Sequence, residues 1–173
     1  MKYSTLLFVL IALSFSACKN EPDHLHDDND HNIFVEDIEK DTAKESIATL
    51  KKNLVTEGYE IFDYVDTKTG DTILMQQYFM AFLKKGPNRS QSKAESDSLQ
   101  AAHLAHLGRM YEEGYADISG PFGDDGDIRG ITIYNVPTLQ MADSLANMDP
   151  MVKAGRLVIE MHPWWAAKGF PLR

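Results

Sequence analysis

The sequence predicts an α+β domain in its second half, because segments with strand patterns and segments with helix patterns alternate there. Three observations support this class: a dense β-forming run, a long helical segment with a capping signal, and a Gly/Asp-rich turn between two later strands. In chain order the expected elements are 77–83, 92–113, 115–118, 130–136, 137–147 and 156–162.

Two further elements are expected before this domain. A helix from Glu36 to Asn53 is predicted by apolar residues at helical spacing, and Gly58 follows it as a stop signal. Partial alternation over 59–65, turn residues over 67–71 and an apolar run over 72–75 then indicate a hairpin. We assign 36–75 as an amino-terminal extension and 76–173 as the main domain.

The main domain opens with the run from Gln77 to Leu83, which favours a buried strand and which Gly86-Pro87 follows closely. Ser92 and Glu95 have the spacing of a capping box, and Gly114 ends the helix that they begin. Further strands flank the acidic loop 123–127, and the last helix lies between Pro137 and Asn147.

The resulting order, βαββαβ, predicts a ferredoxin-like fold of the dimeric α/β-barrel type. One helical layer covers only one face of its sheet. We therefore expect a homodimer that buries the other face, with apolar side chains from Phe79, Phe82, Ile131 and Ile133.

The amino terminus predicts export and lipidation. Lys2 precedes a short apolar run that is typical of a signal peptide, and Phe15-Ser16-Ala17-Cys18 resembles a lipobox. Residues 1–17 are then a lipoprotein signal peptide, and Cys18, the only cysteine, carries acyl chains such as palmitate. These chains are expected to anchor the domain to the outer membrane of a bacterial envelope, outside the cytoplasm. The alternative is an ordinary cleaved signal with an incidental cysteine.

Residues 18–35 are almost free of apolar side chains and predict a disordered tether. Its histidines, His24, His26 and His31, allow weak metal binding, but a solvated linker is the better interpretation and no metal site is predicted. The net charge of −9 argues against nucleic-acid binding. No phosphate loop or paired-cysteine motif is present, so no cofactor is expected.

The long helix carries two histidines on one stripe, together with Leu99 and Met110. A second stripe beside it consists of Leu104, Leu107 and Tyr111, so His103 and His106 are expected to border the packed face. Spacing alone favours histidines that simply satisfy local hydrogen bonds. Asp149-Pro150 by itself indicates a structural turn.

Two segments favour a catalytic interpretation of His103 and Asp149 over the structural one. Ala102-His103-Leu104-Ala105-His106-Leu107, running to Ser119-Gly120-Pro121, and Met148-Asp149-Pro150 with Gly155 resemble the YciI-like (YCII-related) family of small ferredoxin-like domains. The resemblance implies that His103 and Asp149 form a catalytic pair, in which the carboxylate fixes the imidazole tautomer and leaves the other nitrogen for proton transfer. It also implies that Gly120 and Pro121 form the floor of the pocket.

His106, Arg129 and the two tryptophans each have two interpretations, one as part of the substrate site and one outside it. His106 is expected to shape the substrate pocket or to lie on the surface. Arg129 binds an anionic substrate group or pairs with the acidic loop, and pairing is the simpler interpretation. The Trp164-Trp165 pair is expected to be a buried dimer contact or, second, an aromatic lid over the ligand.

Two functions follow. The first is a cofactor-free lyase or isomerase that moves a proton on a small oxygenated ring or lactone, which is the chemistry that the resemblance implies. The second is a non-catalytic module that binds a small-molecule ligand or supports an assembly at the envelope. An open pocket at His103 favours the enzyme, whereas a filled core around His103 favours the second function.

Overall fold

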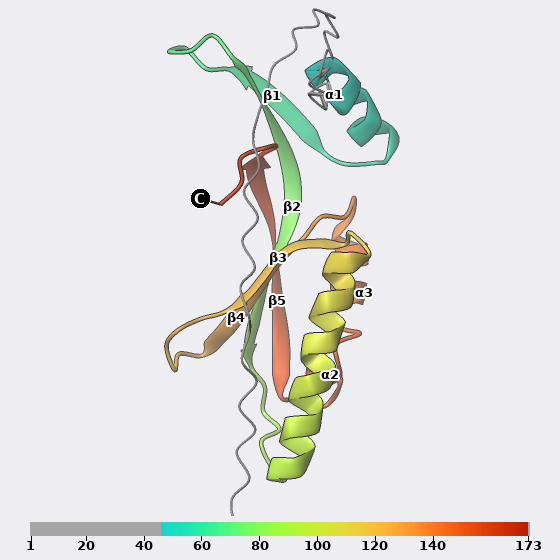
Figure 1. The fold of residues 1–173 in the computed structure, drawn as a ribbon, viewed down its shortest axis with the longest axis vertical. Helices are drawn as coiled ribbons and strands as arrows, with labels where there is room; N and C mark the ends of the chain where they lie inside the picture. The colour runs from blue at the N-terminus through green and yellow to red at the C-terminus, as the bar shows by residue number, and fades with distance from the viewer. Residues whose placement is uncertain (1–45, 173) are drawn as a thin grey trace, which may run out of the picture. The chain divides into compact units, whose positions relative to one another are not determined.

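The computed structural model describes residues 46–172, which form an α+β unit around one five-stranded antiparallel sheet (Figure 1). The strands are β1 (Ile61–Val65), β2 (Thr72–Lys85), β3 (Ala116–Pro121), β4 (Ile128–Tyr134) and β5 (Leu157–Ala167). The helices are α1 (Ile47–Thr56), α2 (Lys93–Glu112), α3 (Leu139–Ala146) and α4 (Pro150–Lys153). The predicted signal peptide, Cys18, the tether and the first part of the predicted helix from Glu36 lie outside the described residues.

The order of the strands confirms the ferredoxin-like prediction. β5, β2, β4 and β3 lie side by side in that order, and each pairs antiparallel with its neighbour. β1 pairs with the first part of β2, on the edge that β4 occupies further along. The ferredoxin-like unit is therefore β2-α2-β3-β4-α3/α4-β5, and β1 extends its sheet.

β2 is a single strand, where the sequence predicted two elements that met near position 76. The segment contains no glycine or proline that would break it, and Gln76 in its middle is fully buried. The Gln76 side-chain amide donates a hydrogen bond of 2.6 Å to Oδ1 of Asn135, just after β4. The predicted extension and main domain thus share one continuous strand.

The start of α2 follows its local signal closely. The Ser92 hydroxyl accepts a hydrogen bond from the Glu95 amide, and the Glu95 carboxylate accepts one from the Ser92 amide. These bonds satisfy two amides that a helix terminus otherwise leaves unpaired. Gly114 follows with a φ of +76°, which ends the helix as predicted.

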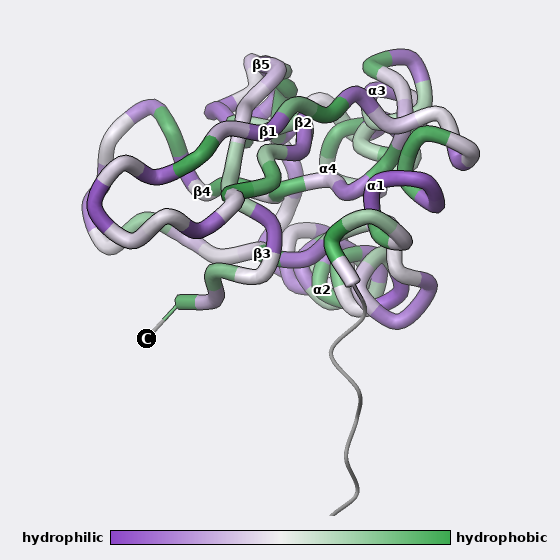
Figure 2. The backbone as a smooth tube through the Cα atoms, turned by 90° about the horizontal axis from the view of Figure 1, so that it is seen from above, coloured by the Kyte–Doolittle hydropathy of each residue, from purple (hydrophilic) through white to green (hydrophobic). Residues whose placement is uncertain are grey.

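α2 and α3 lie on one side of the sheet (Figure 1). The core between them and the sheet includes Phe79, Ala81 and Leu83 of β2, Met110 of α2 and Tyr134 of β4. Figure 2 shows hydrophobic stretches in the middle of the fold, around β4, and hydrophilic stretches toward the outside, in loops and on helices α1 and α2.

The opposite face of the sheet carries Met80 and Phe82 of β2 beside Ile131 and Ile133 of β4. Phe79 belongs to the helix side instead, which corrects its predicted place, because neighbouring strand residues point to opposite faces. Within residues 46–172, no helix has the length and apolar content needed to cross a membrane.

Candidate functional site

A cavity of about 410 Å³ lies between α2 and the end of the sheet formed by β3, β4 and the start of β5. Four of the residues predicted for the site line it: His103, Gly120, Pro121 and Arg129. Leu83, Leu107 and Leu157 give it apolar walls. His103 therefore borders an open cavity and not a filled core.

His103 and Asp149 are brought together from separate elements, as the sequence predicted. His103 Nδ1 lies 2.5 Å from Oδ2 of Asp149, and the two side chains are only 10% and 4% exposed. Asp149 is the N-cap of α4, and its other oxygen, Oδ1, accepts a hydrogen bond of 2.8 Å from the Met151 amide. Both carboxylate oxygens are thus used, one to begin a helix and one to hold the imidazole.

This arrangement fixes the role of each ring nitrogen. An ionised carboxylate only accepts hydrogen bonds, so Asp149 places the proton of the neutral His103 ring on Nδ1. Nε2 then carries a lone pair, and no hydrogen-bond partner for it is present among residues 46–172. Because His103 lines the cavity, Nε2 is the nitrogen available for proton exchange with a ligand.

His106 does not line the cavity, which corrects its predicted place in the substrate pocket. It is 5% exposed and lies about 60° around α2 from His103, on the face that packs inside the domain. Its Nδ1 accepts a hydrogen bond of 3.2 Å from Arg109, whereas its buried Nε2 has no partner among the described residues. Burial lowers the pKa of this ring.

The two predicted stripes of α2 have different environments from those expected. The stripe with the histidines is the buried one, because His103, His106 and Met110 are the buried residues of the helix. Leu104 and Tyr111 of the second stripe are 57% and 69% exposed. The histidines therefore sit within the packed face and do not merely border it.

Gly120 and Pro121 end β3 at the cavity floor, where β3 approaches β4 very closely. A Cβ atom on Gly130 of β4 would lie 2.6 Å from the carbonyl oxygen of Gly120, which is too close for any side chain. Sequence reasoning missed Gly130, because only the strand pairing reveals the contact.

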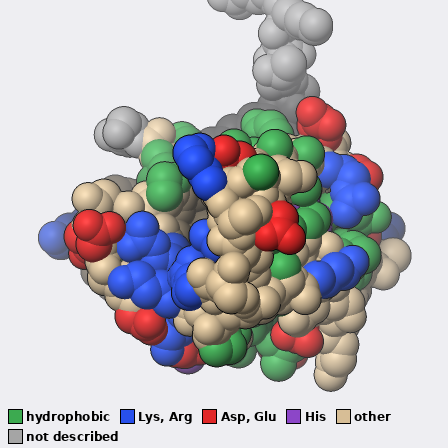
Figure 3. Space-filling view, turned by 90° about the horizontal axis from the view of Figure 1, so that it is seen from below, with side chains coloured by type: hydrophobic (Ala, Val, Ile, Leu, Met, Phe, Trp, Pro, Cys, Tyr) green, Lys and Arg blue, Asp and Glu red, His purple; other side chains and the backbone are tan. Residues whose placement is uncertain are grey.

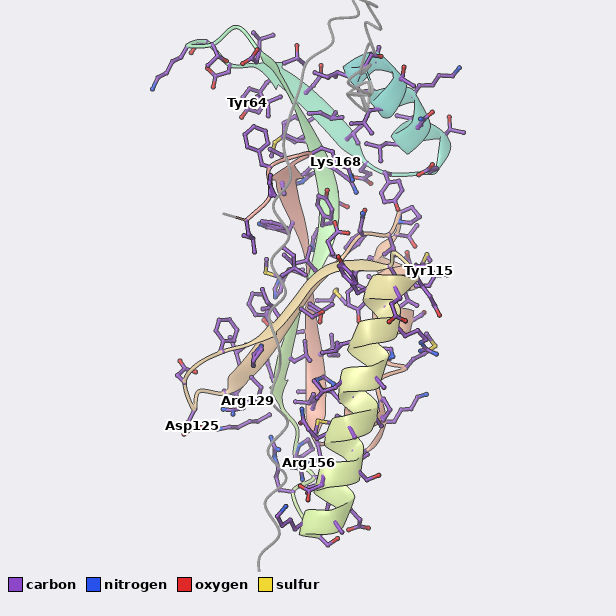
Figure 4. All side chains as sticks on the ribbon, viewed as in Figure 1. Tyr64, Tyr115, Asp125, Arg129, Arg156 and Lys168 are labelled. Atoms are coloured by element: carbon purple, nitrogen blue, oxygen red, sulfur yellow. The ribbon has the colours of Figure 1, made fainter. Side chains whose placement is uncertain are left out.

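Arg129 pairs with the acidic loop, which is the simpler of its two predicted interpretations, and binding of an anionic substrate group stays a prediction. Its guanidinium donates to the carbonyl oxygens of Asp124 and Gly126, lies 3.6 Å from the exposed Asp125 carboxylate, and also lines the cavity. Figure 4 shows Arg129 and Arg156 in the same part of the structure, and Arg156 lies between β5 and α2.

Arg89 and Arg156 also line the cavity, and sequence reasoning missed both. The loop after β2 holds them together, because the Gly86 amide donates to the Arg156 carbonyl and the Asn88 amide donates to the Gly155 carbonyl. Gly86 packs directly against Gly155 and Arg156, with no room for a Cβ atom. The only sequence signal was that Arg156 follows Gly155 of the family-like segment.

The two tryptophans do not form a lid over this cavity, which corrects the second interpretation of them. β5 continues through Pro163 to Ala167, five residues beyond the predicted end, and carries Trp164 and Trp165 away from His103. The ring centroids of Trp165 and Phe62 are 5.0 Å apart, and the Trp164 ring contacts the Tyr78 ring. Among residues 46–172 no group of three or more metal-ligating side chains is present.

The site and the sheet together define a ferredoxin-like domain with a His-Asp pair at a cavity. The chain belongs to the family of the YCII-related domain, whose sequence profile matches residues 78–164. No curated protein matches the chain.

Solved structures that resemble the chain include 5-chloro-2-hydroxyhydroquinone dehydrochlorinase from Burkholderia phenoliruptrix AC1100, in complex with 2,5-dihydroxybenzoquinone. It is 25% identical, over 50% of this chain and 92% of that one, with a TM-score of 0.39.

Proposed function

We propose that the protein is a cofactor-free lyase or isomerase in which His103 moves a proton on a small oxygenated ring or lactone. The observation that carries this proposal is the open cavity beside a buried His103-Asp149 pair. An imidazole that is oriented by a carboxylate through one nitrogen and that borders a cavity is suited to general acid-base catalysis.

In the proposed reaction, Nε2 of His103 takes a proton from a substrate carbon next to a carbonyl group. The electron pair of that carbon–hydrogen bond moves into the substrate as an enolate, and Asp149 stabilises the imidazolium that forms. An isomerase returns the proton to a different substrate atom, whereas a lyase gives it to the departing group. The leucine side chains of the walls offer apolar contacts to the carbon skeleton of the substrate.

We also propose that acyl chains on Cys18 hold the domain at the bacterial envelope, outside the cytoplasm. The support comes from the short apolar run that ends in Phe15-Ser16-Ala17-Cys18. The cavity would then act on small molecules that reach the envelope.

The experiment follows hydrogen exchange at carbon in D₂O by NMR, over a panel of hydroxylated benzoquinones and unsaturated lactones. His103→Ala should slow exchange by about 10²- to 10⁴-fold, the usual contribution of a general base. The matched control is His162→Ala, because His162 is a half-exposed histidine on β5 that does not line the cavity. Equal exchange by the parent and by His103→Ala would contradict the proposal. Compounds that bind at His103 without exchange would favour the non-catalytic module.

Asp149→Asn tests the positioning role separately. Asparagine is also a good N-cap, so α4 should persist. If its amide oxygen keeps the cap, the amide nitrogen faces Nδ1 of His103 and donates to it, which moves the ring proton to Nε2. We expect the ¹⁵N shifts of His103 to report this exchange of tautomers and the carbon exchange rate to fall with it. Unchanged ¹⁵N shifts would rule out this role for Asp149.

A further inference from the structure

The cavity at His103 is positively charged, although the chain carries a net charge of −9. Arg89, Arg129 and Arg156 line it, and no Asp or Glu is among its lining residues. Asp149 lies behind His103, and its two oxygens are already engaged. Figure 3 shows Lys and Arg side chains gathered on the face at this end of the domain.

The charge of Arg156 is not neutralised within the described chain. Its guanidinium donates to a neutral acceptor, the amide oxygen of Gln91, at 2.8 Å. Its Nε is buried and has no hydrogen-bond partner among residues 46–172. A buried donor without a partner is costly, so the described chain does not fully satisfy this guanidinium.

The other two arginines also have capacity for a ligand. Arg89 makes no hydrogen bond or ion pair with any described residue. Arg129 is held by two backbone carbonyls, and the carboxylate of Asp125 near it is fully exposed at 3.6 Å, so water screens this ion pair. The guanidinium groups therefore keep most of their attraction for an anion in the cavity.

We infer that Arg89, Arg129 and Arg156 form an anion-binding subsite and that the substrate at His103 carries a carboxylate. Guanidinium groups bind carboxylates through paired, charge-assisted hydrogen bonds. The apolar walls then hold the carbon skeleton beside Nε2 of His103. This inference rests on the proposed function for its substrate, but the subsite itself is tested by binding alone.

The test compares benzoate with benzamide, which have nearly the same shape but differ in charge. Each is titrated into the full-length protein in detergent, and the ring signals of His103 are followed by NMR. Benzoate should bind at least tenfold more tightly than benzamide, and added salt should weaken only benzoate binding. Equal affinities would overturn the inference, and tighter binding of inorganic phosphate than of benzoate would overturn the assignment to a carboxylate.

Variants locate the subsite. Arg156→Met and Arg89→Met should each weaken benzoate binding by about ten- to a hundredfold, the loss expected for a hydrogen bond to a charged group. Arg109→Met is the control, since Arg109 lies on α2 outside the cavity and the charge change is the same. If Arg156→Met does not fold, the exposed Arg89 still decides the question. Losses no larger than that of the control would overturn the inference.

The two proposals fail in different ways. Arginine-dependent benzoate binding together with carbon exchange that is insensitive to His103→Ala would leave the subsite standing and remove the catalytic role. Exchange on neutral compounds that depends on His103, without any preference for benzoate, would support the catalytic role and remove the anion-binding subsite.

Discussion

At the residue scale, His106 is a buried histidine held in its neutral form. Burial is the main cause of its lowered pKa, and the charges of Arg109, His103 and Lys153 lower it further, while Asp149 partly opposes them. In the unfolded chain the ring has its ordinary pKa of about 6.5. Below that pH the unfolded state binds the proton more readily, so the free energy of unfolding decreases as pH falls.

We predict that His106→Leu flattens this pH dependence. The stability that neutral His106 contributes is fully present above about pH 6.5 and is lost from there down to its lower pKa in the folded state. Leucine has no proton to gain and removes the unpaired Nε2, so near pH 8 the stability should change by only about 1 kcal/mol. Urea unfolding between pH 8 and 5 measures both effects, with His162→Ala as the exposed control.

A parent protein whose stability does not fall below pH 6.5 would contradict this account. An equally steep fall in His106→Leu would instead assign the pH dependence to other groups.

The candidate pair could be predicted from the sequence only through family resemblance. By its own pattern, Asp149 indicated a turn, which is half of its role, because it does cap α4. The place of Arg89 and Arg156 in the cavity wall could not be predicted from the sequence. It depends on backbone hydrogen bonds between the loop after β2 and the turn before β5. Such contacts leave no periodic pattern in either segment.

At the scale of elements, Gly130 shows how closely β3 and β4 approach. We predict that Gly130→Ala destabilises the domain by about 1–3 kcal/mol, because the added Cβ would push the Gly120 carbonyl away and strain the strand pair. Gly120→Ala is the matched control on the neighbouring strand, since its Cβ would meet no atom within 4 Å. Urea unfolding of both variants measures the difference, and equal stabilities would show that β3 moves aside freely.

Elements that carry their own boundary signals were predicted well, and those defined by their partners were not. The capping box and Gly114 are both local in sequence, so both ends of α2 could be predicted from them. β5 continues past Pro163 because β2 pairs with it on only one side, and an edge strand tolerates a residue without an amide hydrogen. The length of β2 likewise depends on β1 and β5, which no single segment reveals.

At the scale of the whole molecule, the sheet face opposite the helices carries Met80, Phe82, Ile131 and Ile133. We predict that this face forms a homodimer, since burying it removes apolar surface from water. Light scattering on the chain from Asn32 onward should give a dimer mass, and Phe82→Lys should give a monomer. The control, Tyr111→Lys, changes an exposed residue of α2. A parent protein that is monomeric at micromolar concentration would exclude this interface.

Lipidation is a separate prediction at this scale. Cys18→Ser should release the protein from the membrane fraction or block its processing, because serine offers no thiol to acylate. Cell fractionation and labelling with a fatty-acid analogue measure this. Membrane association and labelling equal to those of the parent would contradict the lipid anchor.

The long β2 strand determines where the protein can be shortened. The family match begins at Tyr78, inside that strand, and residues 75–77 pair with Trp165, Ala166 and Ala167 of β5. A fragment that begins at Tyr78 but keeps all of β5 would therefore leave residues 165–167 without their backbone partners on β2, and Trp165 without its contact with Phe62. Free strand edges of this kind promote aggregation. A soluble shortened form should begin before β1, at or near Ser46, and not at the family boundary.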